Sequence, residues 1–240
     1  MKSTDKTAIM NTDMKLSDTA RTVSVETEER AALQAHLAAQ MDRLRETERD
    51  PDAATDTRME IARTLLRLEH DAESWNYARQ SFDTYLASKN WQEAVEACNL
   101  LFQSEQSESL AALGMGVWLA VTFPIGVETS VSMLQHIIDE TPDDADGAAV
   151  AAATAHYIAE LRCNDQNRDN WVFFTGQMLG AVARRHSQAE TQEAFSLWME
   201  KLELNDPEKF LIRLRNVIDV LVQDQWWFSR EDLQAALPVH

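Results

Sequence analysis

The sequence predicts an all-α protein built from antiparallel helical hairpins stacked on one another. Only six glycines and five prolines punctuate 240 residues, whereas strand-rich folds use both residue types in their many turns. Apolar residues recur every three or four positions along most of the chain, which is typical of helices with one buried face. The hydrophobic share of 45% is enough to bury a core through one elongated domain over residues 23–240.

The N-terminal sequence predicts a tail followed by two helices. Residues 1–22 mix charged and small polar residues with isolated apolar ones at no regular period, which predicts a disordered tail. A serine cap and a run of glutamates predict a helix over about 24–48. The proline that follows indicates a connecting loop over 51–56. A second helix over about 57–68 completes the N-terminal helices, residues 23–70.

Beyond these helices large aromatic side chains become frequent, as expected where helices stack in layers. The stretch Tyr85–Leu101, YLASKNWQEAVEACNLL, predicts the end of one helix, a tight polar turn and the start of a second helix packed back along the first. Apolar stripes and turn residues predict further helical pairs within 110–142, 147–186 and 190–223. We therefore expect stacked hairpins over 71–223.

The best-defined hairpin resembles a known repeat family. Tyr85 closes its first helix, a tight turn follows, Trp91 opens its second helix, and Ala94 lets the two backbones approach, as in the tetratricopeptide repeat (TPR). The chain departs from that family at Ser81 and Phe82, where a Leu-Gly pair is usual. The resemblance implies a TPR-like α-solenoid, and it favours a protein that binds other proteins.

The C-terminal segment, residues 224–240, has its own signal. Three consecutive aromatic residues, Trp226, Trp227 and Phe228, precede Ser229 at a capping position, which predicts a short capping helix. Two interpretations remain open. The rings fold back onto the end of the last hairpin, or they dock a partner protein, because Trp and Phe commonly anchor interfaces.

Charge and cysteine content exclude several function classes. A net charge of −18 argues against binding nucleic acid or anionic membrane surfaces, since both require Lys and Arg. The chain has no N-terminal apolar run of signal-peptide length, and no stretch approaches the roughly twenty continuous apolar residues of a membrane span, so we expect no membrane insertion. Cys98 and Cys163 are isolated, which favours a reducing, cytoplasmic setting.

Negative charge is concentrated in one span. From Asn90 to Leu161 the chain has no Lys or Arg. This span is either a solvated face that maintains solubility or a negative field that steers a basic segment of a partner protein. The candidate partner-binding carboxylates are Glu128, Asp139, Glu140, Asp143, Asp144 and Asp146. The span could also attract a basic patch that includes Arg185 and Arg213 on a neighbouring copy, so a homo-oligomer stays open.

The sequence carries little that indicates catalysis. The nearest approach to a metal or ligand site is two H-x-x-x-E pairs, His136 with Glu140 and His156 with Glu160, each on one helical face opposite the expected core stripe. An exposed pair of this kind is ordinarily a minor helix-stabilising contact. We expect no cofactor. The prediction is a non-enzymatic interaction module, such as an adaptor, assembly factor or accessory subunit; the alternative is a ligand- or metal-binding protein or enzyme using these two pairs.

Overall fold

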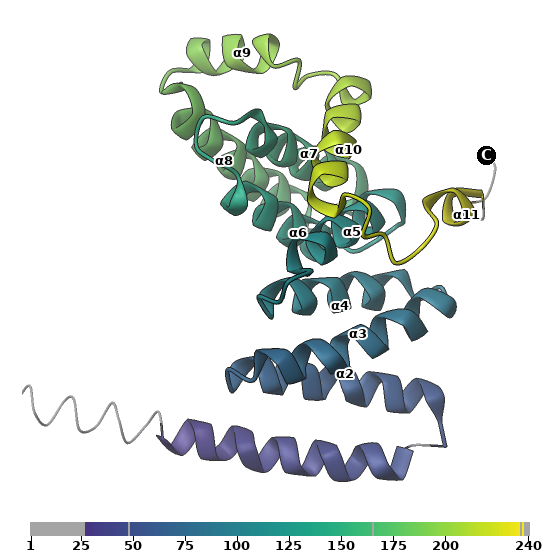
Figure 1. The fold of residues 1–240 in the computed structure, drawn as a ribbon. Helices are drawn as coiled ribbons and strands as arrows, with labels where there is room; N and C mark the ends of the chain where they lie inside the picture. Colours follow the sequence, from purple (N-terminus) through teal and green to yellow (C-terminus); the bar gives the residue numbers. More distant parts are fainter. Residues whose placement is uncertain (1–26, 48, 165, 236, 238–240) are drawn as a thin grey trace, which may run out of the picture.

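The computed structural model describes residues 27–47, 49–164, 166–235 and 237, and these residues form helices and turns without a strand (Figure 1). The predicted all-α class is confirmed for this part of the chain, whereas the predicted tail lies outside it. An N-terminal helix spans 27–47. It is followed by α2 (Pro51–Arg67), α3 (Asp71–Ala87), α4 (Trp91–Gln103), α5 (Ser109–Thr122), α6 (Val127–Glu140), α7 (Asp146–Arg162), α8 (Arg168–Ser187), α9 (Gln192–Lys201), α10 (Pro207–Val222) and α11 (Arg230–Ala235).

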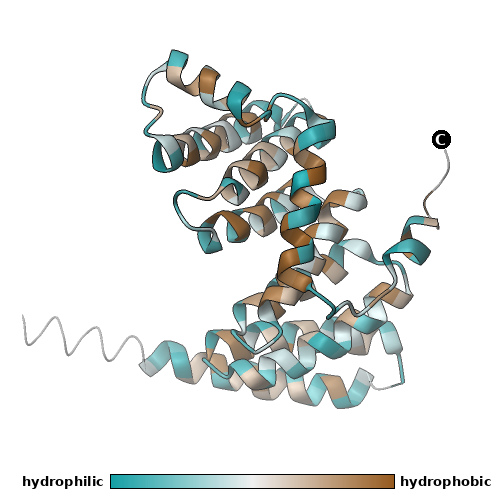
Figure 2. Cartoon of the chain, turned by 45° about the horizontal axis from the view of Figure 1, so that its top comes forward, coloured by the Kyte–Doolittle hydropathy of each residue, from teal (hydrophilic) through white to brown (hydrophobic). Residues whose placement is uncertain are grey.

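Helices α2 to α8 form a continuous stack, because each packs against the next one in the chain. In addition, α2, α4, α6 and α8 contact one another along one side of the stack; we call them the even row. Helix α10 returns to pack against α5 and α7 (Figure 1). Its alternating apolar and polar turns are visible in Figure 2, and the apolar ones supply buried Phe210, Leu214 and Ile218. The buried core therefore runs through the stack from α2 to α8 and continues beneath α10.

Helix α2 begins earlier than the sequence indicated. Residues 51–56, interpreted as a loop, form its first turns. The Asp50 side chain accepts a hydrogen bond from the Ala53 amide at 3.2 Å, and Pro51 occupies the first helical position, where its missing N–H costs nothing. The Asp-Pro pair that ends one helix is thus also the cap that starts the next.

The hairpin predicted around Tyr85–Leu101 is present, as α3 and α4 with a turn between them. Lys89 takes a left-handed conformation, with φ of 61°, and the Asn90 amide donates to the Tyr85 carbonyl at 2.9 Å. Other helix ends also use non-glycine residues at positive φ, among them Glu69 and Glu105. This explains how so few glycines serve so many turns, although each such residue is strained by about 1 kcal/mol.

Close packing accounts for the two glycines of α5, Gly114 and Gly116. A Cβ atom built on Gly116 would lie 2.5 Å from Met133 Cε and 2.7 Å from Cys98 Cβ, and one on Gly114 would lie 2.6 Å from Val222 Cγ2. These separations are too short for any side chain, so both positions require glycine for helix contact.

The fourth predicted pair, within 190–223, is corrected by the structure. Both helices form, as α9 and α10, but α10 packs along α5 and α7 instead of along α9. Its apolar stripe was read correctly, yet the stripe itself does not specify which helix it covers. Gly114 and the small residue Gly147 on α7 allow the approach, since both lie beside α10 side chains.

Removing the Tyr85 hydroxyl should test how this hairpin is fixed to α2. The buried Tyr85 ring lies in the core, and its hydroxyl donates to Asp56 Oδ1 at 2.7 Å. Tyr85→Phe keeps the ring and should lower the free energy of unfolding by about 1 kcal/mol, the usual contribution of one such bond. Urea unfolding of the two proteins measures the difference. A matched Tyr77→Phe change, which removes only a contact to the Met41 sulfur at 3.5 Å, should cost less; equal losses would contradict the assignment.

Candidate functional site

The candidate site on the surface is a set of exposed carboxylates at the turn between α6 and α7. Asp139 and Glu140 end α6, Asp143 and Asp144 follow in the turn, and all four are exposed. Asp146 begins α7. Glu128 lies at the other end of α6, about 18 Å away along the helix axis. The structure therefore brings five of the six predicted carboxylates together and separates Glu128 from them.

Cations from later helices neutralise part of this set. Arg185 Nε lies 3.2 Å from Asp143 Oδ1, and Arg213 Nη2 lies 2.7 Å from Asp146 Oδ2. Within the described part of the chain, no Lys or Arg pairs with Asp139, Glu140 or Asp144; we call these three the acidic edge. From the sequence, Arg185 and Arg213 were considered as part of a basic patch on a neighbouring copy. In the structure they pair with carboxylates of this turn within the same chain.

The same arginines also satisfy helix ends, a role that sequence reasoning missed. Arg185 Nη2 donates to the carbonyl oxygens of Ile138 at 3.0 Å and Thr141 at 3.4 Å, at the C-terminus of α6. Arg213 donates in the same way to Leu202, after α9. A cation at a helix C-terminus is favourable, whereas the carboxylates of Asp139 and Glu140 are not. Two residues of the acidic edge, Asp139 and Glu140, therefore lie where helix stability alone would favour positive charge.

A ladder of polar side chains joins α4 to α6 along the even row. The Gln92 amide donates to Thr129 Oγ1 at 2.7 Å, and the Thr129 hydroxyl donates to Glu96 Oε1 at 2.7 Å. About two turns further along both helices, His136 Nε2 lies 2.9 Å from Asn99 Oδ1, and the centroid of its ring lies 4.7 Å from that of the Phe102 ring. This ladder fixes the register of α4 relative to α6.

His136 does not form a ligand pair with Glu140. Its Nε2 is occupied by Asn99 of the neighbouring helix. Burial lowers the pKa of His136, against the opposing effect of Asp139 and Glu140. A half-buried, hydrogen-bonded imidazole of this kind favours a packing role over metal binding. Among the described residues, no group of three or more His, Cys, Asp and Glu is placed to hold a metal ion.

Apart from the α6–α7 turn, an acidic hollow with a volume of about 360 Å³ lies between α2 and α4. Asp56, Glu60 and Glu93 line it together with Arg63. Desolvation raises the pKa of Glu93, an effect that Arg63, 3.9 Å away, opposes and that Glu96 and Asp56 reinforce. The charged form of Glu93 is thus destabilised by its surroundings, so negative charge here does not serve the stability of the fold.

The C-terminal aromatic residues pack within the chain, on α3 and α5. The Trp227 ring meets those of Trp75 and Phe82 at centroid distances of 6.0 and 5.4 Å, and its Nε1–H donates to Glu108 at 3.1 Å. Trp226 and Phe228 pack against Trp118. All three C-terminal rings are half-buried. They do fold back, but onto the middle of the stack and not onto the last hairpin, and only their remaining surface is open to a partner.

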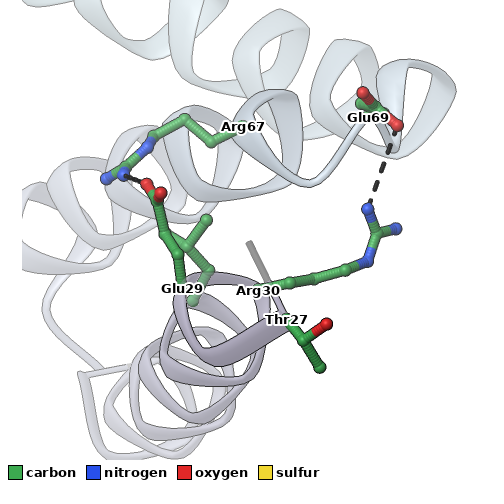
Figure 3. A pocket seen from close by; sticks show the side chains of 6 residues that line it. Thr27, Glu29, Arg30, Arg67 and Glu69 are labelled. Carbon is green, nitrogen blue, oxygen red and sulfur yellow. Dashed lines mark hydrogen bonds and ion pairs between the residues drawn. The ribbon is translucent and has the colours of Figure 1, made fainter. Parts of the chain in front are cut away.

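The second His-Glu pair lines a cavity. His156 and Glu160 of α7 face a partly open space of about 570 Å³ lined by α7, α8, α9 and the start of α10. A further hollow of similar volume lies beside the N-terminal helix. There the charged residues pair with each other, Arg67 with Glu29 at 3.1 Å and Arg30 with Glu69 at 3.9 Å (Figure 3). The N-terminal hollow is therefore explained by ion pairs between neighbouring helices.

The cysteines offer no reactive site. Cys98 is fully buried beside Gly116, and burial raises the pKa of its thiol. The pKa of Cys163 is raised as well, again because of desolvation. Thiolate nucleophiles require the opposite shift. Within the described ranges, no helix is long and apolar enough to cross a membrane.

Comparisons of the chain with known proteins give no further constraint. No protein-family model, no curated protein and no solved structure matches it.

Proposed function

We propose that this protein is a non-enzymatic interaction module that holds a partner protein through the acidic edge, Asp139, Glu140 and Asp144. Its partner presents a basic segment. The observation that carries the proposal is the selective pairing at the α6–α7 turn, where Asp143 and Asp146 have arginine partners and the three residues of the edge have none among the described residues. Complementary charge of this kind raises association rates and selects partners.

The arrangement of the helices supports an interaction role. Two contacts between α4 and α6 share a separation of 37 residues, Gln92 with Thr129 and Asn99 with His136, so these helices run parallel in the stack. We propose on this basis that the stack is a TPR-like series of hairpins, a type of fold that presents extended surfaces to other proteins. The best-matching hairpin departs from the TPR pattern in both of its helices, at Ser81 and Phe82 in the first and at Cys98 and Leu101 in the second. The proposal therefore concerns the architecture and not a consensus repeat.

Stability alone does not explain the acidic edge. Asp139 and Glu140 lie at the negative end of α6, where each carboxylate is unfavourable by about 0.3–1 kcal/mol. Residues that oppose stability and yet are exposed are typical of functional surfaces. A solvated face that only maintains solubility would not need its charges at this helix end.

Charge reversal at the acidic edge tests the proposal. We expect Asp139→Lys, Glu140→Lys and Asp144→Lys together to slow association with the partner about 10-fold at low salt, while the wild-type rate falls as salt is raised. The partner is first captured from the native host with the wild-type chain, and the rates are then measured by stopped flow with the purified pair.

A matched control reverses three exposed carboxylates elsewhere, Glu46, Glu190 and Glu200. It changes the net charge equally and should slow association much less. The helical circular dichroism of both variants should equal that of the wild type. Association that is insensitive both to salt and to the edge variant would show that the partner docks elsewhere. The part of the Trp226–Phe228 cluster left exposed would then be the next surface to test.

A further inference from the structure

The cavity between α7, α8, α9 and α10 has the features of a binding site separate from the acidic edge. Its walls are aromatic: Tyr157 of α7 and Phe210 of α10 meet edge to face at 5.9 Å, and Phe195 of α9 lies on a third side. Its volume of about 570 Å³ is within the range of small-molecule sites, which combine apolar walls with a few polar groups. No Lys or Arg is among the residues that line it.

Two of the polar groups that line the cavity, His156 and Glu160, offer acceptors to it. The Thr175 hydroxyl donates to the Trp171 carbonyl at 2.8 Å, so its oxygen is left to accept the Nδ1–H of His156, 3.0 Å away. In this tautomer, Nε2 of the neutral ring carries a lone pair. Nε2 lies 3.9 Å from Glu160 Oε1, too far for a hydrogen bond between them. Two acceptors therefore face the same space with room for a donor between them.

The cavity is kept open by a glycine in the middle of a helix. A Cβ atom on Gly176 would meet nothing closer than His156 Cε1 at 3.9 Å, so helix packing does not require glycine here. A mid-helix glycine costs about 1 kcal/mol relative to alanine. Gly114 and Gly116 differ, because a side chain at either would collide with a neighbouring helix. Because Gly176 has no side chain, the space in front of His156 stays open.

One wall is a separate, anchored element. Helix α9 crosses between the end of α8 and the start of α10 (Figure 1). The buried Trp198 ring holds it, and Trp198 Nε1–H donates to His186 Nδ1 at 3.2 Å. The Thr191 side chain caps its first turn by accepting from the Ala194 amide. Phe195 thus stands at a defined position across from Tyr157 and Phe210.

We infer that this cavity binds a small organic ammonium ion that carries an apolar group. Aromatic faces attract cations through their quadrupoles, and the Glu160 carboxylate, which has no Lys or Arg partner among the described residues, supplies the opposite charge. The hydrogens of a primary ammonium group fit the two acceptors, Glu160 Oε1 and His156 Nε2. The apolar group would lie against the aromatic walls. An anion would meet the carboxylate without any compensating cation.

Isothermal titration calorimetry of the full chain with three ligands of one shape tests this inference. The probes are 2-phenylethylammonium, neutral 2-phenylethanol and anionic phenylacetate. We expect the ammonium ion to bind at least about 10-fold more tightly than the alcohol, as for a hydrogen-bonded charge, and phenylacetate to bind least. Glu160→Gln should weaken ammonium binding by about the same factor. The matched control is Glu200→Gln, which removes an equal charge from an exposed position on α9 and should change the affinity for the ammonium ion less than about twofold.

A cavity-filling variant and the amide resonances of the wild type test the inference further. Gly176→Leu should fill the cavity and abolish binding while the helical circular dichroism is retained. In the wild type, the ammonium probe should shift the amide resonance of Gly176 and leave that of Asp144, on the acidic edge, unchanged. Absence of saturable binding by the wild type, equal affinity for the three probes, or unchanged affinity in Glu160→Gln would each overturn it. None of these results bears on the acidic edge, so the two proposals succeed or fail independently.

Discussion

Arg162→Ala is expected to lower the free energy of unfolding by about 3–4 kcal/mol, since hydrogen bonds from a charged group contribute about 1.5–3 kcal/mol each and do not add fully. The guanidinium reaches from the end of α7 back to α5. It donates to the carbonyls of Ala120 at 2.7 Å and Val121 at 2.9 Å, in the last turn of α5, and to Ser130 Oγ at 3.3 Å. Removing it would leave these acceptors without their charged partner.

Urea unfolding followed by circular dichroism measures this effect. Arg162→Lys should recover only part of the loss, because a single ammonium group cannot reproduce the planar fork that serves several acceptors. Arg168→Ala is the matched control: that side chain is exposed at the start of α8, and its loss should change stability by less than about 0.5 kcal/mol. Similar losses in the two alanine variants would contradict the capping role of Arg162.

Trp227→Ala is expected to cost about 3 kcal/mol, the usual penalty for emptying a packed aromatic site. The ring contacts Trp75 and Phe82, the Arg79 guanidinium stacks over it at 4.1 Å, and its Nε1–H pairs with Glu108. Truncation removes these contacts together and releases the C-terminal segment from the stack.

The same unfolding measurement applies, with Phe173→Ala as the control. Phe173 is 69% exposed, so its truncation should change stability by less than about 0.5 kcal/mol. The comparison also separates the two interpretations of the C-terminal aromatic residues. If Trp227 served only a partner, its removal would leave the unfolding midpoint of the isolated chain unchanged.

Residues close in sequence were predicted well, because their structure depends on short-range patterns. The apolar stripes identified the helices from α3 to α8 with small errors at their ends, and the turn between Tyr85 and Trp91 lies where the resemblance placed it. The error at residues 51–56 arose from one ambiguity. An Asp-Pro pair both ends a helix and caps the next, and periodicity alone does not measure the gap between them.

The candidate sites were predictable only in part. The carboxylates at the α6–α7 turn were singled out from the sequence, but which of them form ion pairs depends on Arg185 and Arg213, which approach from other helices. The His156 and Glu160 pair was also noticed, although the cavity that it lines could not be predicted. Beside α7 and α8, its walls include α9 and α10, whose positions follow from packing and not from local pattern.

The sequence by itself determined the all-helical class, the order of the helices and the acidic character of their central span, since composition and a period of 3.6 residues carry this information. Tertiary structure alone decided which carboxylates keep their charge unpaired, where α10 packs, and which helices the C-terminal rings join. Trp227 meets Glu108 across 119 positions and Arg213 meets Asp146 across 67. An amphipathic stripe specifies that a face is buried and not what buries it, so such distant pairings are fixed only by the packing of the whole chain.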